Sequence, residues 1–172
     1  GRSSVVNDAG AGDGAHPGAS VRAVYQPIVD LSTGETVAFE ALSRFQGRDP
    51  VEVFATATRQ GAGPALEAAA IREALAGWDR PEPLSLNTSL TSLLSPEVQQ
   101  ELPTDLSRII IEITEGDLVD YSPEMMLMLD GMRARGVRIA IDDLGVGYSN
   151  VERVVTIDPD IIKIDMSLIR SV

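Results

Sequence analysis

The sequence predicts an α/β fold whose mostly parallel sheet curls into a barrel. Short apolar runs alternate along the chain with helical stretches, an order typical of strands joined by crossover helices. The runs are too apolar for a sheet with one solvated face, which favours parallel strands covered by helices. In five runs the bulky apolar residues take one parity, and a polar residue takes the other at or near the carboxyl end. A doubly wound open sheet gives no reason for this recurrence, whereas a barrel with a polar mouth does.

The elements follow from these runs and from the helical stretches between them. The expected strands are Val21–Gln26, Val37–Leu42, Leu84–Asn87, Ile109–Ile113, Arg138–Asp142 and Ile161–Asp165. The expected helices are Pro50–Gln60, Pro64–Trp78, Pro96–Leu102, Pro123–Arg135 and Ser149–Val155.

Two of the helix starts carry the same local signal. Ser95 and Ser122 each offer an N-cap hydroxyl, followed by a proline and then an acid at the positive end of the helix dipole. The helix after Ser122 carries an apolar stripe, and Gly136 is placed to close it. The stripe, which we interpret as core packing, consists of Met125, Met128, Leu129 and Met132.

Composition excludes several classes of protein. The chain has 172 residues, with 14 Lys and Arg against 26 Asp and Glu, so its net charge is −12. This charge argues against binding to DNA or RNA polymers and to anionic membranes. Because the chain has no cysteine and a single histidine, His16, it has no disulfide, no thiolate nucleophile and no zinc site with several histidines. A reducing compartment suits such a chain, and we expect a cytoplasmic location.

Six polar side chains are expected to meet at the mouth of the barrel. They are Glu40, Asn87, Glu112, Asp142, Lys163 and Asp165. Four carboxylates gathered there would repel one another by about 4 kcal/mol per close pair at an effective dielectric constant near 20. Divalent cations would relieve this repulsion, and an all-oxygen ligand set favours Mg²⁺ or Mn²⁺, with Ca²⁺ as a non-catalytic substitute.

Each of these residues also has a purely structural interpretation. A single acid at the end of a strand is usually a solvated loop residue or a helix cap. Lys163 and Asp165 could form a structural ion pair, and Asn87 could cap a turn. The pattern alone leaves both interpretations open, although recurrence in five strands favours the metal site.

From about Val21 to Val172 the chain carries a series of short motifs in order. They are Tyr25-Gln26-Pro27-Ile28-Val29, Glu40-Ala41-Leu42-Ser43-Arg44, Leu86-Asn87-Thr88-Ser89, Ile111-Glu112-Ile113-Thr114-Glu115, Ile141-Asp142-Asp143-Leu144-Gly145-Val146-Gly147-Tyr148-Ser149 and Ile162-Lys163-Ile164-Asp165. In this order and spacing they resemble the EAL-domain family, the bacterial phosphodiesterases that hydrolyse cyclic di-GMP. Leu144 and Val146 stand where the family usually has Phe and Thr.

The resemblance implies a fold, an activity and a metal site. The family fold is a TIM-type barrel with one antiparallel strand, and its product is the linear dinucleotide pGpG. Two divalent ions, Mg²⁺ or Mn²⁺, would be held at the mouth. By resemblance the ligands of the first ion are Glu40, Asn87, Glu112 and Asp142, and Asp142 with Asp143 would help to hold the second.

The resemblance also assigns roles to residues around the metals. Lys163 would position or activate the attacking water, and Asp165 would support that water or the second ion. Glu115 would anchor the loop from Asp143 to Tyr148, which couples metal binding to dimerisation, so a homodimer is implied. The residues that would contact cyclic di-GMP are Gln26 and Leu42, with Arg44 on a phosphate.

The expected domain organisation is a flexible linker or tag remnant over residues 1–20 and an EAL domain over 21–172 that lacks its C-terminal part. A complete barrel needs roughly 250 residues, and about six of its eight strands are present. The family's late glutamate and a glutamine near its last strand would be missing. The chain could be a fragment, a protein ordered only this far, or one closed by a partner's strands.

Three functions remain open at this point. The first is metal-dependent hydrolysis of cyclic di-GMP, which this truncated chain need not perform by itself. The second is a non-catalytic receptor for cyclic di-GMP or a protein-interaction module, which truncation favours and the intact acids disfavour. The third is a metal-dependent barrel enzyme acting on enolates, which would suit Lys163 but does not predict the motif from Glu40 to Arg44.

Overall fold

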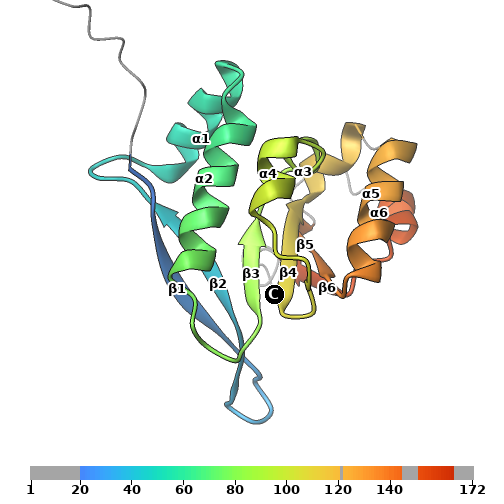
Figure 1. Ribbon diagram of the computed structural model, residues 1–172. Helices are drawn as coiled ribbons and strands as arrows, with labels where there is room; N and C mark the ends of the chain where they lie inside the picture. The colour runs from blue at the N-terminus through green and yellow to red at the C-terminus, as the bar shows by residue number, and fades with distance from the viewer. Residues whose placement is uncertain (1–19, 121, 145–150, 165–172) are drawn as a thin grey trace, which may run out of the picture.

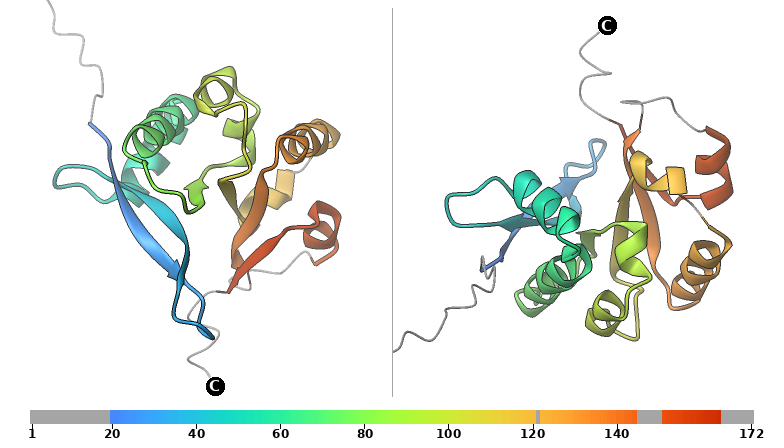
Figure 2. Two further views of the ribbon diagram at one scale, coloured as in Figure 1. Left: turned by 60° about the horizontal axis from the view of Figure 1, so that its bottom comes forward. Right: turned by 90° about the horizontal axis from the view of Figure 1, so that it is seen from above.

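The structure is a curled half-barrel with helices on its convex side (Figure 1). This computed structural model describes residues 20–120, 122–144 and 151–164. One six-stranded sheet has the strand order β1-β2-β3-β4-β5-β6. The helices cover one face of the sheet and leave the concave face open (Figure 2). The predicted α/β architecture, an incomplete barrel, is therefore confirmed.

The strands lie close to their predicted positions. They are β1 (Arg22–Val29), β2 (Thr36–Arg44), β3 (Leu84–Asn87), β4 (Ile109–Thr114), β5 (Arg138–Leu144) and β6 (Ile161–Ile164). The first two strands form an antiparallel hairpin, and every later neighbouring pair is parallel. The single antiparallel strand implied by the resemblance is thus β1. Asp165, the predicted end of the last strand, lies outside the described residues.

The helices are α1 (Pro50–Arg59), α2 (Gly63–Ala76), α3 (Leu90–Leu93), α4 (Pro96–Glu101), η1 (Glu115–Asp120), α5 (Pro123–Ala134) and α6 (Val151–Ile157). The predicted caps are present, since Ser95 accepts a hydrogen bond from the amide of Val98 and Ser122 accepts one from Met125. No sequence pattern predicts α3 or the 3₁₀ helix η1, because four to six residues are too few to show a helical period. No helix within the described ranges is long and apolar enough to cross a bilayer.

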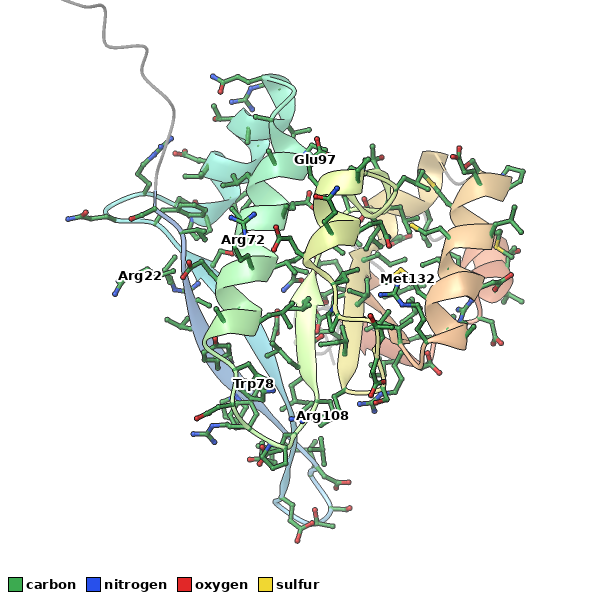
Figure 3. The ribbon with its side chains drawn as sticks, in the orientation of Figure 1. Arg22, Arg72, Trp78, Glu97, Arg108 and Met132 are labelled. Carbon is green, nitrogen blue, oxygen red and sulfur yellow. The ribbon has the colours of Figure 1, made fainter. Side chains whose placement is uncertain are left out.

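The main core lies between the convex face of the sheet and the helices. Apolar strand residues such as Leu84, Ile111 and Ile139 pack there against the helices and are fully buried. Met132 of α5 belongs to this core and is labelled in Figure 3. The predicted stripe on α5 is therefore core packing, as Leu129 beside it also shows.

A smaller apolar cluster lies on the opposite face of the sheet. It consists of Ala38, Ile110 and Ala140, with Ile28 and Ile161 packed against it. Ala38, Ile110 and Ala140 each precede by two residues a polar residue that shares their face, because side chains alternate along a strand. The cluster thus forms an apolar floor beneath the polar residues of the concave face.

Gly136 closes α5 in a backbone conformation that suits only glycine. Its φ is +96°, and a Cβ at this position would lie 2.9 Å from the Cα of Ser107. Gly131 lies within α5, and a Cβ there would meet nothing within 4 Å. A methyl group would therefore clash with the backbone at Gly136 and would meet open space at Gly131.

We expect Gly136→Ala to lower the free energy of unfolding by about 1–3 kcal/mol, because alanine would be strained at this φ and would push against Ser107. Gly131→Ala should raise it by up to about 1 kcal/mol, since alanine is the better helix former. Urea denaturation of both variants checks this. A Gly136→Ala protein as stable as the parent would contradict the account of the helix end.

Candidate metal centre

The side chain of Lys163 lies at the centre of three carboxylates on the concave face. Its Nζ is 2.7 Å from Oε2 of Glu112, 3.1 Å from Oδ2 of Asp142 and 3.3 Å from Oε2 of Glu40. The four residues come from β6, β4, β5 and β2, respectively. They meet because each has the inward parity of its strand and because parallel strands end at the same edge of a sheet.

The second oxygen of each glutamate is held by β3. The side-chain amide of Asn87 donates to Oε1 of Glu40 at 3.0 Å. The hydroxyl of Ser85 donates to Oε1 of Glu112 at 2.5 Å. Each glutamate therefore has one oxygen toward Lys163 and one toward a fixed donor on β3, which restricts its orientation.

Burial and charge act against each other in this cluster. The side chain of Glu112 is only 2% exposed, and that burial raises the pKa of its carboxyl above the ordinary value, although bonds from Lys163 and Ser85 oppose the rise. Burial alone would lower the pKa of Lys163, but its hydrogen bond to Glu112 and the charges of Glu112 and Glu40 outweigh this and hold the pKa above its ordinary value. The acids thus require a positive charge among them.

The donor set at the mouth fits a divalent ion. Glu40, Asn87, Glu112 and Asp142 offer oxygens only, the ligands that Mg²⁺ and Mn²⁺ prefer. Within the described residues no group of three or more acidic side chains is placed to hold a metal ion. In the present arrangement the carboxylates converge on the ammonium of Lys163 instead.

Asp143 and Glu115 lie next to this cluster. Asp143 follows Asp142 at the end of β5 with φ +58°, and its amide donates to Oδ1 of Asp142 at 2.8 Å. Glu115 is the first residue of η1, directly after β4, and is half-buried. The loop that Glu115 is predicted to anchor lies mostly outside the described residues, as does Asp165.

The residues predicted to contact a ligand lie at β1 and at the end of β2. Gln26 is exposed and stands opposite Glu40 in the hairpin. Leu42, Arg44 and Asn87 line a cavity of about 170 Å³ whose far wall includes Phe54 of α1. Among the described residues, Asn87 is the one that this cavity shares with the polar mouth.

Two polar residues that contact this cluster or the turn beside it were not predicted from the sequence. Ser85 is fully buried beside Glu112, and its parity with Asn87 was a usable signal. Glu67 of α2 binds the turn that follows Asn87. No pattern in its alanine-rich helix distinguishes it from a solvated glutamate.

Comparisons with known proteins agree with this geometry. A family model described as "EAL domain" matches residues 18–172. The "Probable cyclic di-GMP phosphodiesterase PdeB" of Escherichia coli is 31% identical over 163 residues, which cover 84% of this chain and 31% of that protein. The chain spans between 19% and 31% of the length of four curated relatives.

Solved structures with the same fold include Klebsiella pneumoniae BlrP1. Its calcium and cyclic di-GMP complex has a TM-score of 0.71 at 28% identity, covering 90% of this chain and 42% of that chain. Its manganese and cyclic di-GMP complex at pH 6 has a TM-score of 0.72 at 28% identity. The match covers 91% of this chain and 43% of the BlrP1 chain.

Lys163→Met should lower the free energy of unfolding by about 3 kcal/mol at neutral pH and without added metal, because it leaves Glu112 buried without a cation. Urea denaturation measures the change. Arg72→Met is the control. Arg72 of α2 (Figure 3) forms an exposed ion pair with Glu101 of α4, and its loss should change stability far less. Equal effects of the two substitutions would show that the cluster does not depend on Lys163.

Proposed function

This chain belongs to the EAL domain family, and from that premise we propose that it carries the catalytic centre of a cyclic di-GMP phosphodiesterase. The reaction adds water to one phosphorus of the cyclic dinucleotide and releases the ribose 3′ oxygen as a hydroxyl, giving linear pGpG. The name of the Escherichia coli relative and the ligand of the BlrP1 complexes support this substrate. The observation that carries the proposal is the group of acids from separate strands around one cation.

Divalent metal ions would bind where the acids now surround Lys163. Their ligands would be Glu40, Asn87, Glu112 and Asp142, with Asp143 beside Asp142 serving a second ion. The manganese complex of BlrP1 supports Mn²⁺, and the oxygen donors suit Mg²⁺ equally. When bound, such ions neutralise charge on the phosphate and promote ionisation of a water.

The remaining residues would orient the reacting groups. Lys163 already donates hydrogen bonds to three carboxylates. When these carboxylates bind metal instead, the ammonium of Lys163 would donate to the attacking water and offset negative charge that develops on the phosphate. We assign Asp165, two residues further on, to the support of that water or of the second ion.

The dinucleotide would extend from the acids toward the end of β2. Arg44 would contact a phosphate, and Gln26 and Leu42 would contact the dinucleotide. The cavity lined by Leu42 and Arg44 supports this placement, because it opens next to Asn87. Glu115 would hold the loop from Asp143 to Tyr148, through which two copies of the chain would form a homodimer.

Hydrolysis of cyclic di-GMP by the complete protein that carries this chain tests the proposal. We expect pGpG in the presence of Mg²⁺ or Mn²⁺ and none after chelation. Glu112→Gln should lower kcat by about a hundredfold or more. Substitution of a residue that only orients a metal ligand typically lowers activity by about tenfold to a hundredfold, and Glu112 is itself a proposed ligand. Glu97→Gln, at an exposed position in the first turn of α4 (Figure 3), should leave kcat unchanged.

Tight binding of cyclic di-GMP without turnover under both metals would reject the proposed reaction. It would instead assign the protein to the receptors of this dinucleotide. Calorimetric titration with cyclic di-GMP therefore accompanies the activity assay.

A further inference from the structure

The carboxylate of Glu67 binds the turn that follows β3. Its Oε2 accepts a hydrogen bond from the hydroxyl of Thr88 at 2.7 Å and one from the amide of Ser89 at 2.9 Å. Its Oε1 accepts a third from the hydroxyl of Ser89 at 3.1 Å. One side chain of α2 thus holds two consecutive residues that are 21 and 22 positions away in sequence.

Two further hydrogen bonds connect the same turn to β4 and to α3. The amide of Thr88 donates to the carbonyl oxygen of Glu112 at 3.1 Å. The hydroxyl of Ser89 accepts a hydrogen bond from the amide of Ser92 and so caps α3. Glu67 therefore links three elements, α2, the end of β3 and the start of α3, at one point.

Asn87 directly precedes this turn, and its side chain has only two rotatable bonds. The place of its amide group therefore depends mainly on where the backbone leaves β3. That amide group bonds Oε1 of Glu40 at 3.0 Å, within the cluster that surrounds Lys163. A displacement of Thr88 and Ser89 would move Asn87 away from Glu40.

We propose that Glu67 is a positioning residue for Asn87. It fixes the turn from Thr88 to Ser89 and thereby directs the amide of Asn87 to Glu40 and to the cation site, an inference that rests on the proposed function for its metal part. Without Glu67, three hydrogen-bond donors of a half-buried turn lose their acceptor. The turn would then rearrange toward water, and Asn87 would move with it.

Three substitutions separate positioning from simple stabilisation. Glu67→Ala removes the acceptor. Glu67→Gln keeps an oxygen for Thr88 and for the amide of Ser89, and its amide group can donate to the hydroxyl of Ser89. Glu73→Ala removes an exposed glutamate from the same helix and serves as the control.

The first measurement needs no metal. In the complete protein we follow the side-chain amide signals of Asn87 by NMR at a temperature where every variant is folded. Glu67→Ala should move these signals toward those of a free side chain, whereas Glu67→Gln and Glu73→Ala should keep them in place. Unchanged signals in Glu67→Ala would overturn the inference, whether or not the protein hydrolyses cyclic di-GMP.

The second measurement is calorimetric titration of the same proteins with Mn²⁺ alone. Glu67→Ala should weaken the affinity by about tenfold to a hundredfold, as is typical of residues that orient a ligand. The Glu67→Ala/Asn87→Ala double variant should bind within about twofold of Asn87→Ala alone, because residues that act through one another are not additive. Additive losses would overturn the inference, while a failure of hydrolysis alone would affect only the proposed function.

Discussion

The repulsion among carboxylates at the mouth of the half-barrel is the constraint on which the site depends. Glu40, Glu112 and Asp142 approach one cation from three strands. Two like charges about 4 Å apart repel by about 4 kcal/mol at an effective dielectric constant near 20. Glu112 cannot escape into water, because its side chain is almost fully buried. The arrangement is stable only with positive charge at its centre, which Lys163 supplies here.

The fold tolerates this concentration of charge because its stability comes from the other face of the sheet. Apolar residues of β3, β4 and β5 pack against the helices in one continuous core. On the concave face, Ala38, Ile110 and Ala140 form an apolar floor beneath the acids. The floor limits water below the cluster, so the charges interact more strongly with one another and with any phosphate above them.

Much of the site could be predicted, because the direction of each strand side chain depends on the local sequence. Alternation along a strand decides which face a residue takes, so the inward position of Glu40 or Lys163 can be deduced from its apolar neighbours. That one strand runs antiparallel was implied only by the family resemblance, since parity does not distinguish parallel from antiparallel strands, and the structure identifies that strand as β1. The role of Glu67 could not be predicted, because it depends on how close α2 comes to the end of β3, and no local pattern encodes that approach. The helix α3 is too short to show a helical period.

The central claim is that the acids around Lys163 form a cation site. The most direct measurement is anomalous diffraction at the manganese edge from crystals of the complete protein grown with Mn²⁺. The account predicts a peak about 2.0–2.6 Å from oxygens of Glu40, Asn87, Glu112 and Asp142, the usual range for hard divalent ions. A manganese peak bound only elsewhere, with Lys163 still held by all three carboxylates, would contradict it.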